Sequence, residues 1–256
     1  MKKILAAFAA LLTLTTHAAD KLVVGATPVP HAEILEFVKP ALAKQGVDLE
    51  IKVFTDFIQP NLQLAQKNLD ANYYQYKPFL DEFNATRKTN IVPVVGVHIE
   101  PFGAYSSRIK RLDELRDGAT IAIPNDPVNT GRALVLLHEA GLLKLKDPSN
   151  TLSTTRDIAE NPHGFKLREL EGALLAHAVN QVDLAFVFAN YALEAGIDTN
   201  SALIVEKGKD LYVEFLAARP DNIDDPRIQK LAKALHSPEL REFILTRYKG
   251  QIVPAF

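Results

Sequence analysis

A short polar segment, residues 124–132 with the sequence PNDPVNTGR, carries the side chains best suited to hold an anion. Asn129 or Thr130 suits the N-cap of a following helix, so that backbone N–H groups and the positive helix end face the loop. Arg132, in the first helical turn, adds a planar guanidinium that pairs with a carboxylate through two hydrogen bonds. The segment therefore indicates a carboxylate-binding turn. An ordinary strand-to-helix connection with a solvated arginine is an equally good interpretation of the pattern alone.

Catalytic chemistry has few candidates in this chain. His98 and Glu100 lie two residues apart, on one face of an expected strand, where they could relay a proton. A local hydrogen bond is the more common result of such spacing. The sequence contains no GxSxG elbow, P-loop, HExxH or GxGxxG motif, and no pair of histidines has ligand spacing with a third partner nearby. We therefore expect a binding protein rather than an enzyme, with no cofactor and no metal.

Apolar strands and amphipathic helices alternate twice along the chain, first after residue 20 and again after residue 119. The segment 98–106 is extended and has no helical period, and residues 211–217 form a strong strand pattern, so each is a candidate crossing between two lobes. Such alternation predicts α/β lobes. We predict one lobe from residues 20–103 with 216–256, a second lobe from residues 104–215, and a hinge of two strands.

Five aromatic side chains fall between Tyr73 and Phe83, in a strand that breaks into a helix at Pro78. Most aromatic residues belong to a core, and that remains the simpler interpretation for any one of them. Tyr74 and Tyr76, however, come at the end of an expected strand, where open α/β sheets bind their ligands. We therefore expect these two to face a ligand.

Composition narrows the classes of function. The 256 residues are 47% hydrophobic and 23% charged, which is ordinary for a globular protein. A net charge of −2 without a basic cluster argues against a nucleic-acid partner.

The first 19 residues predict a signal peptide. A basic start is followed by the apolar residues 4–14, a run too short to span a bilayer, and cleavage is expected after Ala18 or Ala19. Cysteine is absent, so the chain has neither disulfides nor a thiol to carry an N-terminal lipid. We therefore expect a monomer free in the periplasm, without a lipid anchor.

Several segments match one known family in the same order. The segment 124–134 closely resembles the PNDPxNxGRxL signature of the NlpA/MetQ-type substrate-binding proteins of methionine ABC importers. Further matches in family order are Asp70-Ala71-Asn72, Gln75 with Lys77-Pro78 and Leu80, Tyr105-Ser106, the segments 112–118 and 141–147, Glu160-Asn161-Pro162 and Asn190-Tyr191-Ala192. The resemblance covers almost the whole chain after residue 20.

This resemblance implies a periplasmic binding protein of type II-like fold, whose two α/β lobes close by a hinge on an amino acid. It implies that Arg132 and Asn129 hold the α-carboxylate of the ligand. It also implies a side-chain pocket lined by Phe57, Tyr74, Tyr76 and Phe79. Apolar and aromatic walls suit a thioether. The partners implied are a membrane permease and its ATPase.

Three positions depart from the family pattern. Tyr76 stands where these proteins usually have His, and Phe188 and Glu214 stand where they usually have Asn. Phe188 removes a hydrogen-bonding partner and takes up space. Glu214 brings a charge that would attract an ammonium group, a task that Glu100 could share, or would need a partner such as His98 if buried. The residues implied to bind the α-carboxylate are retained, whereas residues that select the ligand in the family are changed.

We therefore expect methionine or a related amino acid as the ligand, and three alternatives stay open. The same fold could bind a methionine derivative, another apolar amino acid or a short peptide. An exported enzyme could use His98 and Glu100 as acid and base. The chain could also be an interaction or sensory protein that has lost transport.

Overall fold

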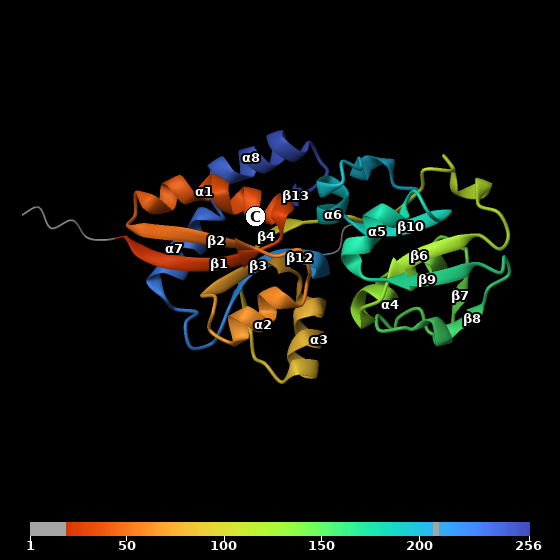
Figure 1. Ribbon diagram of the computed structural model, residues 1–256, viewed down its shortest axis with the longest axis horizontal. Helices are drawn as coiled ribbons and strands as arrows, with labels where there is room; N and C mark the ends of the chain where they lie inside the picture. The colour runs from red at the N-terminus through yellow and green to blue at the C-terminus, as the bar shows by residue number, and fades with distance from the viewer. Residues whose placement is uncertain (1–18, 207–209) are drawn as a thin grey trace, which may run out of the picture.

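Two β-sheets lie next to each other along the long axis of the molecule (Figure 1). The computed structural model describes residues 19–206 and 210–256. The predicted signal peptide, residues 1–19, lies outside the described residues except for its last position. Within the described residues, one sheet has six strands, the other has five, and two short strands pair separately. The predicted α/β architecture is confirmed.

The first sheet has the strand order β13-β4-β12-β3-β1-β2. β1 pairs in parallel with β2 and β3, whereas β12 runs antiparallel between β3 and β4. Because β1 and β3 are parallel neighbours, the segments that follow them emerge at the same edge of the sheet. The strands are β1 (Asp20–Ala26), β2 (Val47–Val53), β3 (Ala71–Gln75), β4 (Val92–Ile99), β12 (Val213–Ala218) and β13 (Val253–Pro254).

Helices cover both faces of this sheet, and β12 shows why. Its side chains alternate: Leu216 packs in a core with the helices α1, α7 and α8, while Phe215 and Ala217 pack in a second core with α2 and α3. Because β12 has apolar side chains on both faces of the sheet, helices must pack on both faces to shield them from water. The helices are η1 (Pro28–Ala32), α1 (Glu33–Ala43), α2 (Gln59–Ala65), α3 (Lys77–Arg87), α7 (Pro226–Ala234) and α8 (Pro238–Tyr248).

The second sheet has the strand order β11-β5-β10-β6-β9. β6 lies in parallel between β10 and β9, and β5 is antiparallel to β10. Its strands are β5 (Phe102–Tyr105), β6 (Thr120–Pro124), β9 (Lys166–Leu170), β10 (Leu184–Phe188) and β11 (Ile204–Val205), with β7 (Lys144–Leu145) and β8 (Ile158–Glu160) as a separate pair. The helices are α4 (Pro127–Glu139), α5 (Gly172–Ala178) and α6 (Ala189–Glu194), with the short turns η2 (Leu112–Glu114), η3 (Thr155–Asp157), η4 (Thr199–Ser201) and η5 (Asp210–Tyr212).

A carboxylate fixes the start of β6 in this sheet. Asp183 accepts hydrogen bonds from the Thr120 N–H at 2.8 Å and from Arg108 Nη1 at 2.9 Å. The Thr120 N–H, with the Arg108 guanidinium, holds the pKa of Asp183 below its ordinary 3.8 despite partial burial. A carboxylate with a lowered folded-state pKa contributes stability above its unfolded pKa and loses it as pH falls through the folded value.

We expect Asp183→Asn to lower the free energy of unfolding by about 1 kcal/mol at pH 7. The difference from wild type should shrink below pH ~4, where the wild-type carboxylate takes up its proton. Urea unfolding at pH 7 and pH 3 measures both values. A pH-independent difference would mean that the charge of Asp183 has no part in the effect.

The chain crosses between the sheets twice, after Ile99 in β4 and before Val213 in β12. Residues 102–103 therefore pair in the second sheet and residues 213–215 in the first, on the opposite sides of the predicted boundaries. An extended segment carries no pattern that marks where it changes sheets. We propose residues 20–99 with 213–256 as one lobe and residues 102–205 as the other. No helix among residues 19–206 and 210–256 has the length and apolarity to cross a membrane.

Candidate functional site

A pocket between the two sheets gathers nine of the ten side chains that the sequence singled out. They are Phe57, Tyr74, Tyr76, Phe79, Glu100, Asn129, Arg132, Phe188 and Glu214. The pocket is also lined by Gln75, Pro101, Phe102, Ala189 and Asn190. The tenth residue, His98, does not line the pocket but lies behind Glu100. Their roles in binding stay predictions.

The pocket is narrow. Its cavity volume is about 20 Å³. That space suffices for a single water, not for an amino acid. A ligand of that size therefore needs the two sides of the pocket to separate.

Arg132 is the central cation of the pocket and is almost fully buried. Its Nε and Nη2 atoms donate to the carboxylate of Glu206, with Nε at 3.0 Å from both carboxylate oxygens. Aromatic rings surround the guanidinium, with Tyr212 at 3.9 Å and Phe102 at 4.7 Å from its central carbon. Burial alone would lower the pKa of Arg132, but Tyr76 and Glu206 outweigh it and raise the pKa, so the charge is kept.

The ion pair between Arg132 and Glu206 was not predicted, because a glutamate in a polar loop gives no sign of its partner. Glu206 occupies only one edge of the guanidinium. Among the described residues, no hydrogen bond from Nη1 of Arg132 is present. Nη1 can therefore donate to an oxygen ligand, with the Tyr76 hydroxyl as a neighbouring acceptor whose pKa Arg132 lowers against the effect of burial.

The helix that carries Arg132 begins earlier than predicted. Asp126, not Asn129 or Thr130, is the N-cap of α4, and its carboxylate accepts the Asn129 N–H at 3.0 Å. Pro127 can start the helix because its missing N–H has no partner to lose there. The Asn129 amide donates to both oxygens of Asp126 at 3.0 Å and accepts from the Tyr76 hydroxyl. Asn129 is therefore already engaged on both sides of its amide.

Aromatic rings form the apolar wall of the pocket. Phe57 is at the centre, with ring centroids of Phe188 at 5.2 Å, Phe79 at 6.1 Å and Tyr74 at 6.2 Å. The Tyr74 hydroxyl donates to the Phe57 carbonyl at 2.8 Å, which fixes the loop that carries Phe57. Tyr191 does not line the pocket but stacks on Phe57 from behind, with ring centroids 5.0 Å apart.

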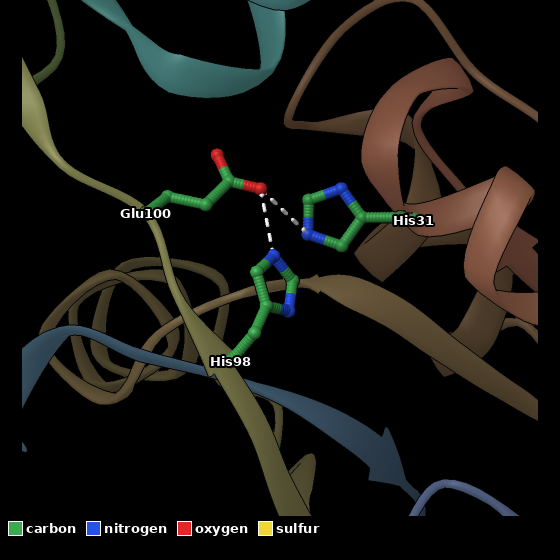
Figure 2. Close-up of side chains that lie close together, drawn as sticks. All are labelled: His31, His98 and Glu100. Atoms are coloured by element: carbon green, nitrogen blue, oxygen red, sulfur yellow. Dashed lines mark hydrogen bonds and ion pairs between the residues drawn. The ribbon is translucent and has the colours of Figure 1, made fainter. Parts of the chain in front are cut away.

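A cluster of two histidines and two glutamates forms the polar end of the pocket. His98 Nε2 donates to Glu100 Oε1 at 2.9 Å, and His31 Nε2 lies 3.4 Å from the same oxygen (Figure 2). Glu214 Oε2 lies 3.8 Å from His31 Nε2. These four residues, His31, His98, Glu100 and Glu214, are named the His–Glu cluster below. All four are buried.

The ionisable groups of the His–Glu cluster differ in their pKa values and therefore in their charge. Burial lowers the pKa of His31 to about 3, so this ring is neutral at pH 7. Burial, together with the charge of Glu100, raises the pKa of Glu214 well above its ordinary 4.5. Burial also acts to raise the pKa of Glu100, but the two histidines and the Asn190 N–H outweigh it and lower that pKa. Glu100 is therefore the carboxylate that carries the negative charge.

His31 was missed, and the sequence did contain a signal for it. It follows β1 in η1, just as Tyr76 follows the parallel strand β3, so both face the same sheet edge. Spacing along the sequence showed no pair of histidines with a third partner nearby, because His31 and His98 are distant in sequence and converge only through the sheet.

The model of the NlpA lipoprotein family matches residues 22–256. The chain belongs to the NlpA lipoprotein family. Another NlpA-type protein, named "Probable D-methionine-binding lipoprotein MetQ" from Pasteurella multocida, is 40% identical over 238 residues, 92% of this chain and 86% of that protein.

Solved structures agree with this membership. A nutrient-binding protein of Burkholderia cenocepacia bound to methionine is 38% identical, with a TM-score of 0.88 over 92% of this chain and 100% of that one. A periplasmic substrate-binding protein of an ABC transporter from Coxiella burnetii is 36% identical, with a TM-score of 0.86 over 91% and 100% of the two chains. The predicted family and periplasmic-binding-protein fold are confirmed, and members of the NlpA family act as substrate-binding proteins.

One prediction is overturned by the family. We expected a protein free in the periplasm without a lipid anchor, but the NlpA family and the Pasteurella relative are named lipoproteins. The expectation rested on the absence of cysteine, the residue that carries the lipid in lipoproteins. The absence of cysteine from one sequence was too weak a basis for predicting where the protein is located and whether it carries a lipid.

Proposed function

We propose that this chain is the substrate-binding component of an ABC importer and closes its two lobes on methionine or a closely related amino acid. The Nη1 edge of Arg132 carries this proposal. A buried guanidinium with one edge paired and the other facing a pocket is a site for a carboxylate, because each oxygen can accept a charge-assisted hydrogen bond. The names of its relatives support the same ligand class.

The acidic side chains of the pocket suit the ammonium group of the ligand. Glu100 and Glu214 both line the pocket, and Glu214 Oε2 is buried without a hydrogen-bond partner. A ligand ammonium supplies the donor that this oxygen lacks, and its charge stabilises the ionised carboxyl. Because the ammonium and the carboxylate are attached to the same carbon, the α-carbon of the ligand must lie between Glu214 and Arg132.

The aromatic wall of the pocket receives the side chain. Phe57, Phe79 and Phe188 offer no hydrogen-bonding groups, so the wall selects an apolar side chain or a thioether. Phe188 and Glu214 differ from the family pattern and favour one alternative, a methionine derivative or another apolar amino acid. A short peptide would need more space on the same wall.

The chain needs no catalytic step in this role. His98 and Glu100 are engaged with each other and with Tyr73 and Asn190, and His98 has no contact with the pocket. We propose a monomer that presents one face of each lobe to a membrane permease driven by an ATPase.

The test is thermal unfolding of the mature protein with single amino acids. Methionine at 100 times its dissociation constant should add about 2.7 kcal/mol of stability. For a chain of this size that is a melting shift of roughly 5–10 °C. A shift with another apolar amino acid and none with methionine would establish the alternative ligand. If no amino acid or short peptide shifts the melting temperature, the proposed function is wrong.

A further inference from the structure

The His–Glu cluster contains two buried polar atoms without partners, and they face one another. His31 Nε2 and Glu214 Oε2 make no hydrogen bond within the described residues, although both are buried. They lie 3.8 Å apart, and His31 Nε2 is 3.4 Å from Glu100 Oε1. Buried polar atoms of folded proteins almost always have a hydrogen-bond partner. Two such atoms without partners at the same place therefore indicate that a ligand binds between them.

The spacing of these atoms matches the coordination shell of a metal ion. His31, His98 and Glu100 each offer one ligand atom, and the three atoms lie within 4.8 Å of one another. In tetrahedral zinc sites the metal–ligand distances are about 2.0–2.2 Å, which puts neighbouring ligand atoms about 3.4 Å apart. The separation from His31 Nε2 to Glu100 Oε1 equals this value. Glu214 Oε2, 3.8 Å from His31 Nε2, lies beside this group but outside it.

The atoms that face away from this point are already held. His31 Nδ1 lies 2.7 Å from the Thr27 hydroxyl, and His98 Nδ1 lies 2.5 Å from the Tyr73 hydroxyl. Glu100 Oε2 accepts the Asn190 N–H at 3.1 Å. Metal-binding histidines and carboxylates are oriented by such outer hydrogen bonds, which leave the inner atoms for the metal.

We propose that the His–Glu cluster is a binding site for a divalent transition-metal ion of the zinc type, with His31 Nε2, His98 Nε2 and Glu100 Oε1 as its ligands and Glu214 as a neighbouring carboxylate. Two imidazoles and a carboxylate form a donor set that suits zinc better than magnesium or calcium, which prefer oxygen alone. Two ionised glutamates also cancel the charge of the ion, so no net charge is buried. Binding displaces the proton between His98 and Glu100 and the proton of Glu214.

This site does not depend on the amino-acid ligand, although the two share carboxylates. Glu100 and Glu214 cannot neutralise a metal ion and an ammonium group at the same time. A zinc-loaded protein should therefore bind an amino acid more weakly than the metal-free protein. Zinc binding in the absence of amino acid tests the metal site alone, so its failure is distinguishable from failure of the proposed function.

The experiment is calorimetric titration of zinc chloride into the chelator-treated mature protein, purified without a histidine tag. Wild type should bind one zinc ion, and His31→Gln and His98→Gln should each weaken binding by at least about 100-fold. Glu214→Gln should weaken it by about 10-fold. The matched control is His163→Gln, since His163 also pairs with a carboxylate, Asp117 at 2.8 Å, but on the surface. Its affinity should equal that of wild type.

Cobalt replaces zinc as a second readout that needs no variant. Tetrahedral Co²⁺ bound at nitrogen and oxygen ligands gives a strong visible absorption, and zinc added afterwards should abolish it. This spectrum decides the matter if the histidine variants do not fold. No stoichiometric zinc binding by wild type, or an equal loss in His163→Gln, would overturn the proposal.

Discussion

Arg132→Ala is expected to remove about 2–5 kcal/mol of binding free energy, a loss of about 30-fold to several thousand-fold in affinity. The guanidinium is buried, and its Nη1 edge is the one cationic donor that we assign to the ligand carboxylate. The substitution should also destabilise the ligand-free protein by about 3–5 kcal/mol, because it leaves the carboxylate of Glu206 buried without a partner. Calorimetric titration with the preferred amino acid and urea unfolding measure the two effects.

A double variant separates binding from folding. Glu206→Gln in the Arg132→Ala background removes the stranded charge, so it should restore most of the lost stability and none of the lost affinity. Unchanged affinity in Arg132→Ala would sink the assignment of the carboxylate site. Recovery of affinity in the double variant would mean that the loss came from misfolding.

Gly131→Ala is expected to lower the free energy of unfolding by about 3 kcal/mol, at the upper end for overpacked positions. A Cβ at this position would lie 2.1 Å from the Thr151 carbonyl oxygen and 3.1 Å from the Ser153 nitrogen. These are backbone atoms, which cannot rotate away as a side chain does. The helix α4 must therefore move, and Asn129 and Arg132 move with it. Thermal unfolding should show a fall of roughly 6–12 °C in melting temperature.

Gly172→Ala is the matched control for this prediction. Gly172 is also in a helix, but a Cβ there would meet only ring carbons, with Phe188 at 3.2 Å and Tyr191 at 3.4 Å. Aromatic side chains can shift by the few tenths of an ångström required, and alanine favours the helix. We expect a change within about 1 kcal/mol. Equal losses in both variants would show that the contact with residues 151–153 is not what requires glycine at position 131.

The sequence predicted side chains at strand ends well and predicted their partners poorly. Tyr74 and Tyr76 come at the end of a strand, and strand periodicity alone indicates where they emerge, whereas Phe188 was singled out by the family resemblance. Arg132 was found through the polar loop that precedes its helix. Its partner Glu206 lies far away in sequence, in a segment without periodicity, so nothing local indicated that they would meet.

Convergence of distant residues was the second limit. His31 lies beside His98 only because β12 and β3 separate β4 from β1 by a fixed distance across the sheet. Spacing along the chain cannot encode such a contact, since it depends on strand order. Extended segments without helical period led us to predict lobe boundaries after residues 103 and 215, but the point at which each strand changes sheets depends on pairing.

The two strands that leave the first sheet at the crossings, β4 and β12, are paired with each other up to their crossing ends. Glu214 pairs with His98, and Val213 with Ile99. A rotation that opens the lobes must turn about this double strand, and atoms near an axis of rotation move least. Glu100 and Glu214 lie beside it, whereas Arg132 sits on the far lobe. We therefore expect Glu100 and Glu214 to keep their arrangement while the protein is open. A ligand would then bind first through its ammonium group, and it would be enclosed only when closure of the lobes brings Arg132 to its carboxylate.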